Sequence, residues 1–246
     1  MGKGSSMKAT PRIEENWALF LDLDGTLLDI APSPDQVVVP SDLVSALTAI
    51  KVRLSGALAI VSGRPFAEID ELLRPMQLSG GAEHGAFIRD AQGQMRKSPG
   101  LHDIPDAWRR ELHSATKRWS GVQVEEKSQS IVLHFRQAPD RDEDLKRLAA
   151  TLVERDPTHF HILHAKMAYE IRPRGTTKGG VVAHLMNETP FSGRVPVFVG
   201  DDVTDEDGMM AARMLGGHGL HVHEEFAGEA SNVRSWLAEG AETQSE

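Results

Sequence analysis

Two patterns of apolar and polar residues follow one another along the chain, and each predicts a different kind of structure. In the first third and again near the end, short apolar runs such as 18–21 and 195–199 have the composition of parallel strands buried on both faces. Segments with helical spacing, for example 41–54 and 177–188, lie between them. A later helical segment, 205–215, has three methionines that we expect in the core: Met209, Met210 and Met214. The alternation favours an α/β fold with a doubly wound parallel sheet.

Between these parts the pattern changes. It predicts amphipathic helices and β-hairpins whose strands alternate apolar and polar residues. The order is helix, hairpin, helix, hairpin, at 104–121, 122–135, 142–156 and 158–173. The simplest topology is a smaller α/β domain inserted into the larger one. We expect residues 1–84 to form the first part of the core, with 1–10 as a disordered leader, residues 85–173 to form the inserted cap, and residues 174–246 to complete the core.

Composition narrows the class of protein without indicating a function. The chain is 40% hydrophobic and 26% charged, which is ordinary for a globular protein. No apolar run approaches the roughly 20 residues that span a bilayer, and the N-terminus lacks the basic-then-apolar order of a signal peptide. We therefore expect a cytoplasmic protein without membrane contacts, and we take it to be a monomer. Because there is no cysteine, a bound metal needs oxygen or imidazole ligands.

The distribution of charge adds a hint about ligands. The formal net charge of −9 disfavours nucleic acid, which requires clustered Lys and Arg. Residues 85–173 nevertheless carry 15 Lys and Arg against 13 Asp and Glu, a net of +2, which leaves −11 for the rest. The acidic part is suited to a cation, and the middle segment to an anion.

Acidic residues stand where strands are expected to end. The strand 18–21 leads into the sequence DLDGT, residues 22–26, and the strand 195–199 leads into GDDVTDED, residues 200–207. Ligands of open α/β sheets bind at the carboxyl ends of the strands. Carboxylates crowded at one edge raise one another's pKa unless a cation neutralises them. A hard dication such as Mg²⁺, which prefers oxygen ligands, would do so.

Each motif also has a purely structural interpretation. A D-x-D-G sequence after a strand is often a turn with an Asx hydrogen bond. A lysine near a helix start, such as Lys178, is usually a solvated surface charge, and the acids of 201–205 would favour the positive end of the following helix. A reaction site is favoured because all of them, together with the triplet 62–64 (SGR), lie at matching ends of strands or helices.

In this order the motifs resemble those of the haloacid dehalogenase-like phosphohydrolases, and the insert resembles that superfamily's α/β cap of the second class (type C2). Further segments resemble the trehalose-6-phosphate phosphatase family: LFLDLDGTLLDIAPSPDQVVVP, LAIVSGRP, GAEHGAFIRD, VLHFR, YEIRPRGTTKGG and FVGDDVTDED. The resemblance implies a haloacid dehalogenase-like core and Mg²⁺-dependent hydrolysis of trehalose 6-phosphate to trehalose and phosphate.

The resemblance also implies roles for the acidic residues. Asp22 would be the nucleophile that forms an aspartyl-phosphate, and Asp24 the general acid and then the base. The Mg²⁺ ligands would be the Asp22 and Asp201 carboxylates and the Asp24 carbonyl. Asp205 would support these ligands without binding the ion directly, or would bind it through a water molecule. Asp202 could contribute to the metal site or only cap the next helix.

Phosphate binding is assigned in the same way. Ser62 and the Gly63 amide would bind the phosphoryl oxygens, while Lys178 would supply a positive charge to both nucleophile and phosphate. Arg64 and His84 are expected at the hinge or the rim.

The sugar is assigned to the cap. By resemblance, the residues that would form hydrogen bonds with sugar hydroxyls are Glu125, Lys127, Arg136, Lys166 and Glu170. The alternative for each is a cross-strand ion pair on a solvated sheet face.

Two other functions remain open from the sequence. The first is a phosphatase of the same architecture that acts on another sugar phosphate, such as sucrose phosphate or mannosylglycerate phosphate. The second is a sugar-phosphate sensor without catalysis, which the presence of Asp22, Asp24, Lys178 and Asp201 together disfavours.

Overall fold

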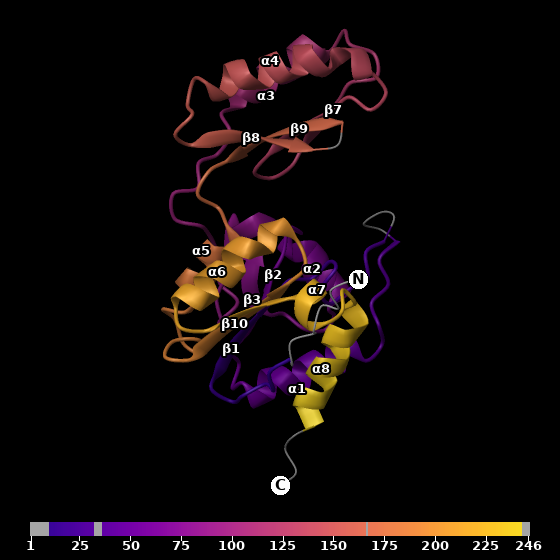
Figure 1. The fold of residues 1–246 in the computed structure, drawn as a ribbon. Coiled ribbons are helices and arrows are strands. Elements are labelled where there is room, and N and C mark those ends of the chain that lie inside the picture. Colours follow the sequence, from indigo (N-terminus) through magenta and orange to yellow (C-terminus); the bar gives the residue numbers. More distant parts are fainter. Residues whose placement is uncertain (1–9, 32–35, 166, 243–246) are drawn as a thin grey trace, which may run out of the picture. The chain divides into compact units, whose positions relative to one another are not determined.

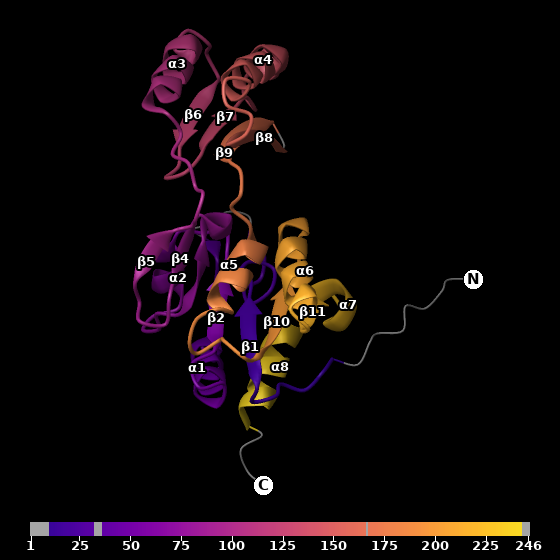
Figure 2. The same cartoon turned by 90° about the vertical axis from the view of Figure 1, so that its left-hand side faces the viewer.

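The computed structural model describes three stretches of the chain, residues 10–31, 36–165 and 167–242. They form two compact units: the core, from Met1–Ser98 and Thr177–Glu246, and the cap, from Pro99–Thr176 (Figures 1 and 2). Of the expected leader only Thr10 lies among the described residues. Its hydroxyl donates to the Glu225 carbonyl at 2.8 Å, so Thr10 is part of the core.

Within the described residues, the core is built on a seven-stranded sheet with the order β11-β10-β1-β2-β3-β4-β5. Its strands are β1 (Trp17–Leu21), β2 (Leu58–Val61), β3 (Ser79–Ala82), β4 (Phe87–Arg89), β5 (Met95–Lys97), β10 (Val195–Gly200) and β11 (His218–His221). The strands from β11 to β3 in this order are parallel, and β4 and β5 are antiparallel. Because the chain starts in the middle at β1 and builds outward in both directions, the sheet is doubly wound, as predicted.

Helices cover both faces of this sheet. They are α1 (Leu43–Arg53), α2 (Phe66–Leu72), α5 (Lys178–Leu185), α6 (Glu206–Met214), α7 (Val222–Glu225) and α8 (Ala230–Glu242), with short 3₁₀ helices η2 (Glu83–Gly85) and η4 (Val203–Asp205). Figure 1 shows α5 and α6 on one face of the sheet and α1 and α8 on the other, as expected when strands are added on both sides of β1 through right-handed crossovers. Helix α8 packs beside α1, and α6 beside α5. In the described ranges no helix combines the length and hydropathy that a bilayer-spanning segment needs.

The first predicted domain boundary, at residue 84, differs from the observed one. Residues 87–97, assigned to the cap from the sequence, extend the core sheet: Ile88 lies opposite Gly81, and β5 pairs with β4. Ile88 is buried in the core, and the Arg89 guanidinium binds a carboxylate on α2 at 2.7 Å. The pattern misplaced this segment because its short alternating strands look like the cap hairpins. The second boundary, at Thr176, lies close to the predicted one.

The described part of the cap contains a four-stranded antiparallel sheet with the order β6-β7-β9-β8. Its elements are α3 (Asp106–Thr116), β6 (Gln123–Glu126), β7 (Ile131–His134), η3 (Pro139–Arg141), α4 (Asp142–Val153), β8 (Phe160–Ala165) and β9 (Ala168–Pro173). One sheet face packs on both helices through apolar side chains that include Trp108, Leu133, Leu145 and Ile171. Figure 1 shows α3 and α4 on the same side of this sheet, so neither of these two helices covers the opposite face, the open face of the cap sheet.

Helix α6 exposes more apolar surface than predicted. Met209 is fully buried, but Met210 is 58% exposed and Met214 is 80% exposed. Two of the three methionines expected in the core are therefore on the surface. The buried side of α6 is instead formed by Gly208, Met209 and Ala212.

Candidate active site

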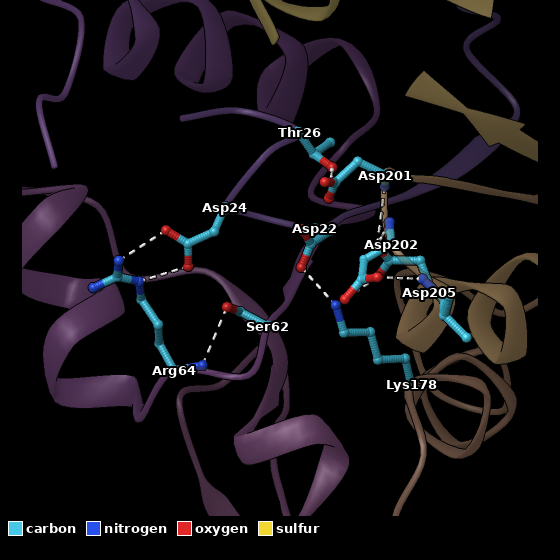
Figure 3. A network of polar contacts seen from close by, with 10 residues as sticks. Asp22, Asp24, Thr26, Ser62, Arg64, Lys178, Asp201, Asp202 and Asp205 are labelled. Carbon is cyan, nitrogen blue, oxygen red and sulfur yellow. Dashed lines mark hydrogen bonds and ion pairs between the residues drawn. The ribbon is translucent and has the colours of Figure 1, made fainter. Parts of the chain in front are cut away.

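The carboxyl end of β1 delivers Asp22 into a buried cluster of charges. The Asp22 amide donates to the Val199 carbonyl of β10 at 3.0 Å, which continues the sheet by one residue. The side chain is 5% exposed, and its Oδ1 accepts from Lys178 Nζ at 2.6 Å. Lys178 also donates to Asp205 Oδ1 at 2.5 Å. The lysine thus bridges two acids that stand 183 positions apart in the sequence (Figure 3).

The start of α5 positions that lysine. Thr177 is the N-cap, and its hydroxyl oxygen accepts from the Gly180 amide at 3.0 Å. Lys178 is the first residue of the helix and is 3% exposed. The lysine near a helix start is therefore not a solvated surface charge.

Burial and crowding perturb both partners of the ion pair. Burial and, to a smaller extent, Asp205 raise the pKa of Asp22 to about 7, although Lys178 opposes the shift. Burial lowers the pKa of Lys178, but the charges of Asp22 and Asp205 outweigh it and the net pKa is raised. One lysine does not compensate the neighbouring carboxylates, so the cluster has a deficit of positive charge.

Asp205 and Asp202 organise the loop after β10. Asp205 is fully buried, and its Oδ2 accepts from the amides of Asp201 and Asp202, both at 3.0 Å. Asp202 Oδ1 accepts from the Val203 amide at 2.6 Å and forms a capping box with Asp205 at η4. The structure therefore supports the capping alternative for Asp202.

The site can accommodate a divalent cation. Asp22, Asp201 and Asp205 each offer one carboxylate oxygen, and these oxygens lie within 4.8 Å of one another. Burial, followed by the charges of Asp205 and Asp202, raises the pKa of the half-buried Asp201. Oxygen ligands and uncompensated negative charge suit a hard dication. Asp205 already accepts three hydrogen bonds, from Lys178 and two backbone amides, so Asp22 and Asp201 keep more acceptor capacity for the ion.

Gly25 lets the two strand-end loops come together. Its φ is +81°, a conformation that favours glycine, and a Cβ there would stand 2.2 Å from Asp201 Oδ2. Next to it, the fully buried Thr26 donates its hydroxyl to Asp201 Oδ1 at 3.4 Å. The D-x-D-G-T sequence is therefore both a turn and part of the site.

Asp24 lies apart from this cluster and faces Arg64. Arg64 donates from Nε to Asp24 Oδ2 at 2.6 Å and from Nη2 to Asp24 Oδ1 at 2.8 Å. Ser62 is 1% exposed, and its hydroxyl accepts from the Arg64 amide at 3.2 Å. Arg64 was expected only at the hinge or the rim, and its contact with Asp24 was not predicted from the sequence. Gly63 is close-packed, since a Cβ there would meet the His84 ring at 2.7 Å.

Comparison with known proteins identifies the family. Residues 20–235 match the family described as trehalose-phosphatase. The chain belongs to the trehalose-phosphatase family. The trehalose-6-phosphate phosphatase of Escherichia coli K12 is 39% identical over 235 residues, covering 94% of this chain and 85% of that protein. A probable trehalose-phosphate phosphatase of Sinorhizobium fredii NGR234 is 40% identical over 208 residues, covering 85% and 78%.

Solved structures agree with the fold of this trehalose-phosphatase family member. The trehalose-6-phosphate phosphatase of Aspergillus fumigatus superposes with a TM-score of 0.66 at 22% identity, covering 96% of this chain and all of that one. The match and the topology confirm the predicted haloacid dehalogenase-like core with an inserted α/β cap.

In the cap, the residues assigned to sugar binding are only partly brought together. Strand register places Glu125 and Glu170 on the open face, on either side of Val132. Lys127 lies 3.8 Å from Glu170 Oε1, which also accepts from the Ser130 hydroxyl at 2.5 Å.

The remaining cap assignments are less well placed. Glu125 Oε2 is 2.7 Å from His134 Nε2, and Arg136 is exposed. Lys166 lies outside the described residues. The ion-pair alternative thus has support for Lys127 and Glu170, whose side chains are 48% and 18% exposed.

Proposed function

We propose that the chain hydrolyses trehalose 6-phosphate to trehalose and phosphate with the help of Mg²⁺. The observation that carries the proposal is the buried Asp22 at the end of β1, bonded to Lys178, in a chain of the trehalose-phosphatase family. We further propose that the protein is a cytoplasmic monomer that binds neither nucleic acid nor a membrane. The net charge of −9 supports the absence of nucleic acid binding.

Asp22 is the proposed nucleophile. The carboxylate oxygen that does not accept from Lys178 attacks the phosphorus atom, the bond from phosphorus to the sugar oxygen breaks, and an aspartyl-phosphate forms. Water then attacks that phosphorus and releases phosphate, which regenerates the carboxylate. Lys178 offsets negative charge on both the nucleophile and the phosphoryl oxygens, which lowers the repulsion between two anions.

Asp24 is the proposed proton carrier. It gives a proton to the departing sugar oxygen in the first step and takes one from the attacking water in the second. Its side chain is 38% exposed, against 5% for Asp22. The exposure supports this division of labour, because the leaving sugar and the water approach from outside the buried cluster.

The remaining core residues bind the phosphoryl group and the metal. The Ser62 hydroxyl and Gly63 amide are proposed donors to the phosphoryl oxygens. Mg²⁺ would be held by the Asp22 and Asp201 carboxylates and the Asp24 carbonyl, with Asp205 orienting the loop and Lys178. When bound, the ion supplies positive charge that neutralises the phosphate.

Sugar recognition is proposed for the open face of the cap sheet. Glu125, Lys127 and Glu170 offer charged donors and acceptors there, and directional polar groups of this kind suit sugar hydroxyls. Arg136 and Lys166 stay in the proposal by family resemblance alone.

The proposal is tested by phosphate release from trehalose 6-phosphate with Mg²⁺, with a chelator, and with Mg²⁺ restored. We expect turnover that is lost on chelation, recovered with Mg²⁺, and absent in Asp22→Asn. Undiminished turnover with the chelator would contradict the metal requirement. A wild type that releases no phosphate from this substrate would contradict the function itself.

A further inference from the structure

Arg64 makes a two-point contact with Asp24 that the proposed reaction leaves without a purpose. The two donor–acceptor distances are 2.6 and 2.8 Å, and the Arg64 side chain is 13% exposed. The side chains of both Arg64 and Asp24 are partly buried. A planar arginine fork on a carboxylate fixes geometry as well as charge, unlike a single contact. In Figure 3 the Asp24 carboxylate faces Arg64, whereas that of Asp22 faces Lys178.

The guanidinium is itself held in place. Its Nη1 donates to Glu68 Oε2 of α2 at 3.2 Å. The Arg64 amide bonds to Ser62 Oγ, and the Arg64 carbonyl accepts from the Glu83 amide at 3.1 Å. Arg64 therefore connects Asp24 to the loop after β2, where Ser62 is proposed to bind phosphate.

We propose that Arg64 is a positioning residue that orients the Asp24 carboxylate toward the leaving oxygen. The inference rests on the proposed function, because it requires Asp24 to exchange protons with that oxygen. A carboxylate oxygen that accepts one hydrogen bond keeps a second acceptor position. The fork thus orients Asp24 without occupying all of its acceptor capacity. In the described part of the chain, Arg64 is the side chain that bonds to this carboxylate.

The proposal predicts a loss that depends on the leaving group. A sugar oxygen needs a proton to depart, whereas a nitrophenolate departs readily without one. In Arg64→Ala we expect kcat/KM for trehalose 6-phosphate to fall about 10- to 100-fold, the range that a misplaced catalytic group produces. For para-nitrophenyl phosphate we expect a loss of less than about threefold. This parameter covers steps up to leaving-group departure, so later hydrolysis of the aspartyl-phosphate does not obscure it.

A double-mutant cycle separates positioning from a general effect on the site. Arg64→Ala added to Asp24→Asn should not change the ratio of the two kcat/KM values further, because the residue it orients is already disabled. Arg64→Lys, which keeps the charge but lacks the fork, should fall between wild type and Arg64→Ala. It also serves as the test variant if Arg64→Ala fails to fold, as judged by circular dichroism.

Arg155→Ala is a matched control, since Arg155 forms an exposed fork with Glu111 in the cap at 2.8 Å for both contacts. It should leave both kcat/KM values within about twofold of wild type. Equal losses on the two substrates in Arg64→Ala and Arg64→Lys, or a further change of the ratio in the Asp24→Asn background, would overturn the proposal. If wild type does not hydrolyse trehalose 6-phosphate, the proposed function fails, and the ratio is measured with another alkyl phosphosugar that it does hydrolyse. A wild type inactive on every phosphate ester contradicts both.

Discussion

At the scale of single residues, five aspartates of one rim differ because their partners differ. Asp22 is bonded to Lys178, and Asp24 to Arg64. The other three belong to the loop after β10, where Asp205 accepts two backbone amides, Asp202 caps η4 and Asp201 accepts from a threonine hydroxyl. Residue type alone therefore predicts an acidic site, and the contacts decide which acid can be nucleophile, proton carrier or scaffold.

The nucleophile can be identified by trapping its covalent intermediate. Asp24→Asn lacks the base for the second step, but an aryl phosphate still passes the first step because its leaving group needs no proton. We expect phosphorylated Asp22 to accumulate in this variant, detected by acid quench and peptide mass spectrometry. Asp22→Asn combined with Asp24→Asn is the control and should stay unlabelled. A phosphoryl group on any other residue would exclude Asp22 as the nucleophile.

The raised pKa of Asp22 predicts that metal affinity depends on pH. Below about pH 7 the metal-free protein holds a proton on this carboxylate, and a dication must displace it. Mg²⁺ binding should therefore strengthen as pH rises from 6 to about 7, by up to about tenfold per pH unit, and level off above. Calorimetric titration of wild type measures this, and Asp22→Asn should bind weakly with a flatter profile. An affinity that is constant or weakens with rising pH would contradict the assignment.

At the scale of elements, the start of α5 links helix capping to the site. Thr177→Ala removes the side-chain acceptor for the Gly180 amide, and loss of such a cap costs about 0.5–2 kcal/mol of unfolding free energy. Urea unfolding should show this loss, with a smaller change for Thr151→Ala on the exposed side of α4. Because the cap precedes Lys178 directly, we also expect reduced kcat. Stability equal to wild type would mean that the cap contributes little.

Elements were predictable where one local pattern decides them. Buried parallel strands give uninterrupted apolar runs, so β1 and β10 and the acids after them could be read directly from the sequence. The pairing of Arg64 with Asp24 could not, because it joins residues 40 positions apart through the order of the strands. The same holds for β4 and β5, whose short alternation does not reveal which sheet they join. Met210 and Met214 are exposed, although their spacing suggested a buried helix face. Helical spacing shows which residues share a face, but not whether another element packs against that face.

At the scale of the whole molecule, one unit carries the proposed chemistry and the other the proposed choice of sugar. With the observed bounds the cap has 13 Lys and Arg against 12 Asp and Glu. The net charge of this unit is therefore close to zero, and its bulk charge is a weaker argument for anion binding than the sequence bounds suggested. Individual side chains on the open face must supply specificity.

Cap substitutions should therefore separate two substrates. Glu170→Ala or Lys127→Ala leaves sugar hydroxyls unpaired, which costs about 1–3 kcal/mol each, or roughly 5- to 150-fold in kcat/KM for trehalose 6-phosphate. Hydrolysis of para-nitrophenyl phosphate should stay nearly unchanged, because this substrate lacks those hydroxyls. Parallel losses on both substrates would indicate a role in folding or in positioning the cap.

Glu111→Ala, which removes a charge on α3 whose side chain is 40% exposed, is the matched control for these cap variants and should affect neither substrate. If Glu170→Ala and Lys127→Ala behave like this control, the two residues form only the surface ion pair at 3.8 Å.

The measurement that tests the central claim most directly is a comparison of kcat/KM across phosphosugars in the presence of Mg²⁺. The panel contains trehalose 6-phosphate, sucrose phosphate, mannosylglycerate phosphate and glucose 6-phosphate. All four present the same phosphoryl group to Asp22 and Lys178, so differences among them arise from recognition of the sugar. We expect trehalose 6-phosphate to be preferred by at least about tenfold, as is usual when a site hydrogen-bonds substrate hydroxyls. An equal or higher kcat/KM for any of the others would contradict it.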